Sequence, residues 1–134
     1  MSTIYAAVVA VFRGSKILML KRRPDDRNYT GWCLPGGSKE KEDANLEQTA
    51  KRELVEETGF TDGPGVFRYR LSTIHAPKGL PLRINVYSMG APKGDVELSD
   101  EHTEFRWVTL EEALQLDLAG TATREILRFF TRMP

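Results

Sequence analysis

Residues 45–59 carry the strongest helix signal in the sequence and constrain the fold more than any other segment. Asn45 is a residue type that favours the N-cap position, and Gln48, three residues later, completes a pattern similar to a capping box. Apolar side chains recur at helical spacing on one face, at Leu46, Ala50 and Leu54. Gly59 suits the left-handed C-cap. The segment therefore predicts a helix whose apolar face has to be buried by another element.

Three glutamates lie on one face of this helix, in its C-terminal half. Glu53, Glu56 and Glu57 are spaced so that their charges destabilise an isolated helix by roughly 0.2–0.5 kcal/mol per pair. The helix dipole disfavours carboxylates at this end as well. Arg52 offsets part of the repulsion, but a divalent cation would offset it better. Because Mg²⁺ prefers carboxylate oxygens, this face predicts a metal site, with a solvated acidic surface as the alternative.

A glycine-rich turn at Pro35, Gly36 and Gly37 precedes the helix. Because glycine has no Cβ, the backbone of such a turn can approach a ligand or a metal closely. The turn and the glutamates at the unfavourable end of the helix together favour the metal site over a merely solvated surface.

Strand patterns lie on both sides of the helix. Runs rich in β-branched and apolar residues, bounded by turn residues, predict strands at residues 4–12, 17–20, 32–34, 66–74, 82–89 and 105–108. Residues 24–30 predict a loop. Thr109 and Glu112 form a second capping box that opens a short helix through Leu116, and residues 121–133 predict a final amphipathic helix. This order predicts an α/β fold with a mixed sheet covered on both faces.

Size and charge narrow the class of protein. The 134 residues correspond to a single domain over residues 1–134. Lys and Arg together number 19, as do Asp and Glu, and this balance argues against a nucleic-acid-binding protein. The apolar run at residues 4–12 is shorter than the roughly 20 residues of a membrane span. It also lacks the features of a secretion signal, so we expect a cytoplasmic protein that does not bind membranes.

Cys33 is the single cysteine, which excludes an internal disulfide and makes a cysteine-based zinc site improbable. Nothing beside it in the sequence supplies a base. We therefore expect Cys33 to serve as a small buried apolar residue.

The acidic helix resembles the signature of the Nudix hydrolases, G-x5-E-x7-R-E-U-x-E-E-x-G-U, in which U is a bulky apolar residue. Residues 52–60, Arg-Glu-Leu-Val-Glu-Glu-Thr-Gly-Phe, match its whole second half. Residues 32–37 resemble the usual lead-in, and the resemblance extends over nearly the whole chain. The compact length is similar to that of MutT-like members. The resemblance implies the Nudix fold, a mixed β-sheet sandwiched between α-helices (α/β/α).

The first half of the signature is irregular in this chain. Counting back from Arg52, the expected glutamate falls on Ala44 and the expected glycine on Ser38. The loop therefore carries one extra residue, and either Glu42 or Asp43 replaces the missing acid.

The resemblance also implies a set of metal ligands. The carboxylates of Glu53, Glu56 and Glu57, with the backbone carbonyl of Gly37, would bind Mg²⁺, with Mn²⁺ as the alternative cation. Arg52 would orient the glutamates through ion pairs. The bound metal would neutralise the diphosphate and lower the pKa of a water molecule that attacks phosphorus.

A catalytic base and a phosphate-binding residue are also needed. Glu53 is one candidate base, and the acidic loop supplies two others, of which Glu101 is favoured over Glu104 by its distance from the following strand. Arg22 and Arg23 are the candidates for contacting substrate phosphate, because arginine binds phosphate oxygens in a bidentate manner. Alternation along a strand lets only one of the two face a cleft, and the resemblance to MutT-like members favours Arg23.

The expected activity is hydrolysis of a diphosphate bond in a nucleoside diphosphate linked to another group. Similarity to MutT-like members implies a (deoxy)nucleoside triphosphate pyrophosphohydrolase acting on a small-molecule nucleotide. Hydrolysis of ADP-ribose or a nucleotide sugar is the alternative, with Pro77 near the position of a proline in such enzymes. Two other classes remain open: a non-catalytic nucleotide-binding module, and an interaction domain with an acidic surface. The sequence allows a monomer or a homodimer.

Overall fold

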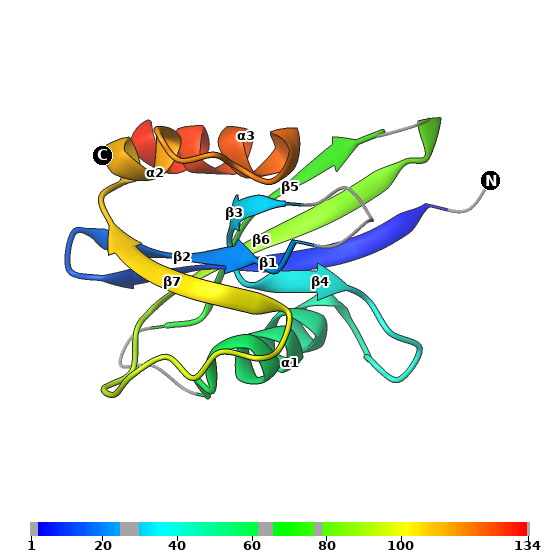
Figure 1. Ribbon diagram of the computed structural model, residues 1–134. Helices are drawn as coiled ribbons and strands as arrows, with labels where there is room; N and C mark the ends of the chain where they lie inside the picture. Colours follow the sequence, from blue (N-terminus) through cyan, green and yellow to red (C-terminus); the bar gives the residue numbers. More distant parts are fainter. Residues whose placement is uncertain (1–2, 25–29, 62–65, 77–78, 134) are drawn as a thin grey trace.

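The structure is a computed structural model that describes residues 3–24, 30–61, 66–76 and 79–133. Within these residues, seven strands form one mixed sheet, with α1 on one face and α2 and α3 on the other (Figure 1). The strands are β1 (Ile4–Arg13), β2 (Lys16–Arg22), β3 (Gly31–Cys33), β4 (Gly36–Ser38), β5 (Arg68–His75), β6 (Leu82–Gly90) and β7 (His102–Val108). The helices are α1 (Leu46–Thr58), α2 (Leu110–Leu114) and α3 (Gly120–Thr131). The predicted α/β/α arrangement is confirmed.

The long strand β1 organises the sheet. It runs parallel to β6 along its length, in the order β3-β2-β1-β6-β5. On its other edge, the C-terminal residues of β1 pair with β2, whereas residues 6–8 pair with β4. β7 pairs with β2, and all of these pairings except β1 with β6 are antiparallel. The glycine-rich turn is thereby held against the middle of the sheet.

The two caps of α1 form as the sequence predicts, with one difference. The side chain of Asn45 accepts a hydrogen bond from the backbone of Gln48, and Gly59 adopts a left-handed conformation with φ of 77°. The Gln48 side chain, however, accepts from the backbone N–H of Ala44 rather than from that of Asn45. The capping box of Thr109 and Glu112 is present in full.

Two strand segments differ from their predictions. Residues 36–38, expected as a turn, form β4, because pairing with β1 satisfies their backbone despite the poor strand propensity of glycine. β7 begins at His102 rather than at residue 105, and its polar residues 103 and 104 are exposed. The predicted loop at residues 24–30 lies mostly outside the described residues, as does Pro77.

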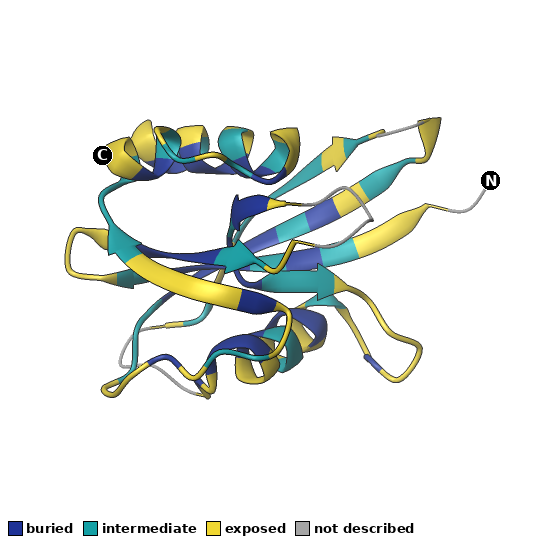
Figure 2. Cartoon of the chain, in the orientation of Figure 1, coloured by how far each residue is buried: buried dark blue, intermediate teal, exposed yellow. Residues whose placement is uncertain are grey.

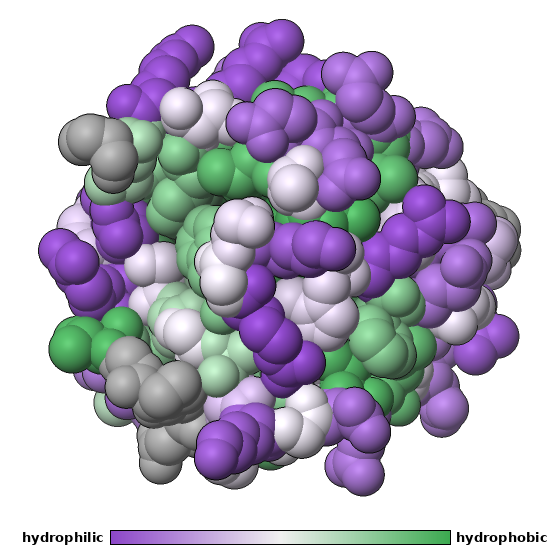
Figure 3. Space-filling view, turned by 90° about the vertical axis from the view of Figure 1, so that its left-hand side faces the viewer, coloured by the Kyte–Doolittle hydropathy of each residue, from purple (hydrophilic) through white to green (hydrophobic). Residues whose placement is uncertain are grey.

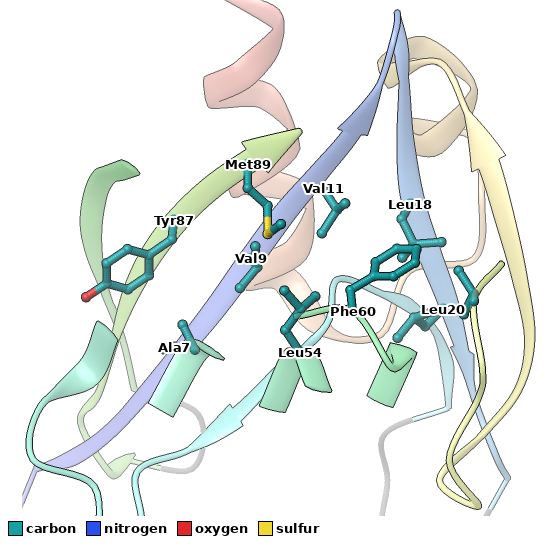
Figure 4. Packing of buried hydrophobic residues seen from close by; sticks show 11 residues of the cluster. Ala7, Val9, Val11, Leu18, Leu20, Leu54, Phe60, Tyr87 and Met89 are labelled. Carbon is teal, nitrogen blue, oxygen red and sulfur yellow. The ribbon is translucent and has the colours of Figure 1, made fainter. Parts of the chain in front are cut away.

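The alternation of side chains along β1 and β2 divides the core into two layers, one on each face of the sheet. Buried residues gather on the central strands and on the sides of the helices that pack against them (Figure 2). On the α1 face, Leu18 and Leu20 point toward Leu54 and Phe60 (Figure 4). On the opposite face, buried side chains of the sheet pack against α3, namely Ala10, Ile17, Met19, Trp32, Ile84 and Val86 with Ile126, Leu127 and Phe130. The acidic face of α1 therefore lies beside the first layer.

Grooves open on the α3 side of the sheet, away from the acidic helix. One is lined by residues of β5 and α3, and another includes Phe12, Phe130 and Met133. At the end of the molecule that carries the β1–β2 turn, apolar surface is interrupted by charged side chains (Figure 3). No helix in the described part of the chain is long and apolar enough to span a membrane.

Candidate functional site

The two glycines of β4 lie in close contact with their neighbours. A Cβ on Gly36 would clash with the backbone oxygen of Ala7 in β1. A Cβ on Gly37 would lie 2.7 Å from the carboxylate of Glu53. Because neither position has room for a side chain, the strand packs tightly between β1 and α1. The backbone at Gly37 is thereby in contact with the first glutamate of the acidic face.

Glu57 is the buried member of the acidic face. Its side chain is 3% exposed, and its Oε1 accepts a hydrogen bond of 3.0 Å from the backbone N–H of Gly36. Burial, together with the neighbouring carboxyl group of Glu53, raises the pKa of Glu57 to about 9.

Arg52 links the acidic face to the preceding loop. Its Nη1 donates to Glu53 Oε1 at 2.7 Å and to Glu56 at 3.2 Å. Its Nε and Nη2 donate to the two carboxylate oxygens of Asp43 at 3.0 and 2.9 Å, and Nη2 also reaches the carbonyl of Ser38 at 3.2 Å. The guanidinium thus orients glutamates and loop together, through the planar fork that arginine provides.

Asp43 occupies the position left open by the irregular first half of the motif. Its carboxylate also accepts from the hydroxyl of Thr49 and from the backbone N–H of Glu40, both at 2.9 Å. The hydrogen bonds from Arg52 hold the pKa of Asp43 well below its usual range. Glu42, the other candidate, is exposed. Residue counting left the choice between the two open because it cannot show which carboxylate turns inward.

Glu56 lies apart from Glu53 and Glu57. It is exposed, and among the described residues its carboxylate contacts Arg52. Across the described ranges, no three His, Cys, Asp or Glu side chains are already gathered as a metal-binding group. Glu53 and Glu57 nevertheless converge beside Gly37, with Glu56 one turn away on the same helix. This set of hard oxygen donors, with two carboxylates that repel without a cation, fits Mg²⁺.

The opposite wall of the site comes from β2, β3 and the start of β7. Arg22 and Glu57 both lie close enough to Cys33 to change the pKa of its thiol. Burial, the larger effect, raises that pKa to about 12, and Cys33 packs against the α1-side core as expected of a small apolar residue. His102 is 4% exposed, with its Nε2 3.8 Å from Cys33 Sγ. Burial and the charge of Arg22 lower the pKa of His102 to about 4.

The two candidate bases of the acidic loop lie in different surroundings. Glu101 is near enough to Glu57 to raise the pKa of that carboxyl group. Glu104 forms an ion pair of 3.4 Å with Lys21. Since Lys21 and Arg22 are consecutive in β2, this pair lies on the other side of the strand from Arg22. The geometry therefore favours Glu101 over Glu104.

The two candidate phosphate-binding arginines also differ. Arg22 shares the α1 face of β2 with Leu18 and Leu20 and lies near Cys33. Arg23 is exposed, and its Nε donates to the backbone carbonyl of Asp100 at 2.6 Å. In this geometry Arg22 is the arginine that faces the site, whereas the family resemblance favoured Arg23.

His102 is a site residue that sequence reasoning missed. The signal was weak, since a lone histidine at the end of an acidic run is ordinarily a solvated side chain. Only the pairing of β7 with β2 brings it beside Arg22 and Cys33.

Known proteins are similar to this chain over most of its length. The family model of the NUDIX domain matches residues 1–130. A curated relative, the ADPR responsive transcriptional repressor NtrR of Acinetobacter baylyi, is 34% identical over 125 residues, which make up 87% of this chain and 48% of the relative. The chain thus spans about half the length of that relative.

Solved structures share the fold. The MutT protein from Methanosarcina mazei superimposes with a TM-score of 0.82 at 28% identity, covering 97% of this chain and 94% of that protein. The NUDIX domain of Shewanella oneidensis NrtR, complexed with ADP ribose, gives a TM-score of 0.81 at 19% identity, covering 98% and 88% of the two chains. At this lower identity the likeness concerns the fold alone.

Proposed function

Because the chain belongs to the NUDIX domain family, we propose that it is a Mg²⁺-dependent enzyme that hydrolyses a diphosphate bond in a nucleoside diphosphate linked to another group. The observation that carries the proposal is the pair of converging carboxylates, Glu53 and Glu57, beside the backbone of Gly37. Two neighbouring carboxylates, one of them buried, repel each other when no cation is bound. The retention of this pair together with Arg52 and Glu56 supports a catalytic role over a purely structural one.

Each residue then has a distinct task. Glu53, Glu56 and Glu57, with the carbonyl of Gly37, would hold Mg²⁺. When bound, Mg²⁺ would neutralise the diphosphate and lower the pKa of a water molecule. Arg52 orients Glu53 and Glu56 through its ion pairs.

The opposite wall would handle the substrate. Arg22 would bind phosphate oxygens through its planar guanidinium. Glu101 lies within electrostatic range of Glu57 and would accept the proton of the attacking water, with Glu53 as the alternative base. Phosphoryl transfer depends mainly on positioning and charge, so these groups suffice without a protein nucleophile.

We propose (deoxy)nucleoside triphosphates as the substrate class, cleaved to a monophosphate and pyrophosphate. The support is the likeness to the MutT protein of Methanosarcina mazei, which covers almost the whole of both chains.

ADP-ribose is the second candidate ligand. The relative at 34% identity is described as ADPR responsive and as a repressor, and a similar fold binds ADP ribose in the NrtR domain of Shewanella oneidensis. Under this alternative the chain either hydrolyses ADP-ribose or binds it without turnover, as a sensing module would. Nucleotide sugars belong to the same group of candidates.

Hydrolysis assays separate these possibilities. The purified chain is incubated with Mg²⁺ and, in parallel, with deoxynucleoside triphosphates, ADP-ribose and a nucleotide sugar, and phosphate-containing products are measured. The proposal expects the deoxynucleoside triphosphates to be cleaved far faster than ADP-ribose or the nucleotide sugar. Binding of ADP-ribose without any turnover would instead identify a non-catalytic module.

The Glu57→Gln variant tests the metal assignment. It keeps the size of the side chain but removes a ligand charge, so turnover should fall below about 1% of the wild-type rate while the circular dichroism spectrum is unchanged. Glu47→Gln is the matched control, because Glu47 lies on the same helix and pairs with Lys51 on the exposed face. Near-wild-type turnover in Glu57→Gln would rule out the assigned metal ligands.

A further inference from the structure

A β-bulge lies where β7 passes the candidate site. Lys21 of β2 is paired with Glu104, but the next residue, Arg22, is paired with His102, so that one residue of β7 is skipped. The skipped residue, Thr103, is exposed, whereas His102 is buried. Bulges of this kind re-aim side chains and are over-represented next to active sites. Here the bulge brings an imidazole, in place of a threonine, to the site face of the sheet.

His102 is the side chain that flanks Arg22 across the sheet. On the β3 side, the residue paired with Arg22 is Gly31, which has no side chain, and a Cβ there would clash with the backbone of Asp117. On the β7 side, the paired residue is His102. Side chains of directly paired residues lie on the same face and within contact of each other. The direction of the Arg22 side chain is therefore set from one side, by the imidazole.

The imidazole is itself fixed and uncharged. Its Nε2 lies 3.8 Å from the thiol of Cys33, which keeps its proton because burial raises the pKa of that thiol. The lowered pKa of His102 keeps the ring neutral at pH 7. A neutral neighbour does not compete with phosphate for the guanidinium, as a carboxylate at this position would.

Two buried nitrogen atoms in this cluster have no hydrogen-bond partner among the described residues. They are Nε of Arg22 and Nδ1 of His102. Unsatisfied buried polar atoms are rare in folded proteins and costly, which is unexpected for a cluster that serves stability alone. The same residues lie within electrostatic range of Cys33, which in turn lies within range of Glu57. The cluster is thus part of the wall that faces the carboxylates.

We propose that His102 is a positioning residue, which the bulge of β7 places beside Arg22 to hold its guanidinium toward the phosphate groups of the substrate without neutralising it. This inference rests on the proposed function, in which Arg22 binds the diphosphate. It gives His102 a role in substrate binding and none in holding the metal.

A double-mutant cycle tests the proposal. Inorganic pyrophosphate in the presence of Mg²⁺ is the probe, and its affinity is measured by calorimetry for wild type, Arg22→Gln, His102→Phe and the double variant. Each single variant should weaken pyrophosphate binding about tenfold. Because His102 acts through Arg22, the double variant should bind no more weakly than Arg22→Gln. The affinity of His102→Phe for Mg²⁺ alone should stay at the wild-type value.

Matched controls separate positioning from packing. When Arg23→Gln is combined with His102→Phe, the two losses of pyrophosphate affinity should simply multiply, because the side chain of Arg23 is hydrogen-bonded to the carbonyl of Asp100 instead. Thr103→Val, at the skipped position, should bind pyrophosphate as wild type does. His102→Gln is carried through the same cycle, so that a folding defect in His102→Phe does not decide the result. In kinetic assays, His102→Gln should raise KM while changing kcat little.

The outcomes are distinct. Any of three results would overturn the proposal. The losses of pyrophosphate affinity could multiply when Arg22→Gln and His102→Phe are combined, or the affinity could be unchanged in both His102 variants. The third result is that wild type binds no pyrophosphate. If wild type binds pyrophosphate and shows the coupling but hydrolyses no nucleotide, the proposed hydrolase activity fails while the link between His102 and Arg22 stands.

Discussion

The guanidinium of Arg52 connects the loop to the acidic helix at the scale of single residues. One side of it is bonded to both oxygens of Asp43, and the other side is bonded to Glu53 and Glu56. Asp43 would not touch the metal, yet it fixes the arginine that orients two proposed metal ligands. Partners one step removed from a metal commonly change metal affinity by tenfold or more when they are lost.

Asp43→Asn should therefore weaken the binding of Mg²⁺ by about tenfold. The asparagine keeps the shape of the side chain but loses the charge that holds Arg52, so Glu53 and Glu56 become less well oriented. Titration calorimetry with Mg²⁺ measures the change. Glu42→Gln, at the exposed neighbouring position, is the control and should bind as wild type does; equal losses in both variants would point to a general charge effect.

The same residue should shape the acid stability of the protein. Since the folded-state pKa of Asp43 is depressed, its contribution to stability is fully present above the unfolded pKa of about 3.9. That contribution is lost as the pH falls from there toward the folded pKa. Urea unfolding of wild type from pH 6 to pH 2 should show a steep loss of stability below about pH 4. In Asp43→Asn this loss should be smaller, and identical slopes would show that other carboxylates cause it.

At the scale of elements, β4 and the C-terminal half of α1 build the site together. β4 is only three residues long, but it is hydrogen-bonded to β1 and packed against α1. Its two glycines face different neighbours, one the backbone of β1 and the other the carboxylate of Glu53. Substitutions at the two positions should therefore fail in different ways.

Gly37→Ala should act mainly on activity. Its Cβ would lie 2.7 Å from the Glu53 carboxylate, which has to move, and a displacement of this kind can lower turnover by about 100-fold. Gly36→Ala should act mainly on stability, since its Cβ meets the backbone of Ala7, and overpacking costs about 1–3 kcal/mol.

Initial rates and urea unfolding, measured on both variants, separate the two effects, with Ser38→Ala as the exposed control. The explanation would be wrong if Gly37→Ala kept full activity, or if Gly36→Ala unfolded like wild type.

The elements differ in how far the sequence predicts them. α1 is predictable to its ends, because its cap residues and its apolar spacing are local signals. β4 is not, since glycine disfavours strands and the stabilising partner lies about 30 positions earlier in the chain. The first residues of β7 were missed for the same reason: they are polar and exposed, and only pairing with β2 makes them a strand.

For the whole molecule, the sheet separates two layers. The layer on the α1 face contains the candidate site, and the layer on the α3 face contains much of the core. The acidic helix, Arg22 and His102 lie on the α1 face, whereas α3 packs on the other. A change in the α3 layer should thus affect stability with little effect on metal binding.

Leu127→Ala tests this separation. Leu127 is a fully buried residue of α3 that packs against the sheet, so its truncation should cost about 2–5 kcal/mol of unfolding free energy. Under conditions where the variant is still folded, its affinity for Mg²⁺ should match that of wild type. Arg128→Ala, the exposed neighbour, should leave the unfolding free energy almost unchanged. A weakened metal affinity in folded Leu127→Ala would show that the layers are coupled.

The site as a whole could be predicted only in part. The acidic face of α1 follows from nearby residues, because spacing within a helix fixes which side chains share a face. The opposite wall does not, since Arg22, Cys33 and His102 are brought together by three different strands. The choice of Asp43 over Glu42 also depended on the path of the loop, which residue counting cannot supply.

The shared edge of β1 has a consequence for insertions and deletions. β2 and β4 are both aligned on the same strand, and β6 pairs along its opposite edge. Removing one residue from the middle of β1 would turn half of its side chains to the wrong face and displace Gly36 and Gly37 relative to α1. The loop before α1, by contrast, already contains one residue more than the signature and still supplies its carboxylate. Length changes are therefore tolerable beside the site but not in the strand beneath it.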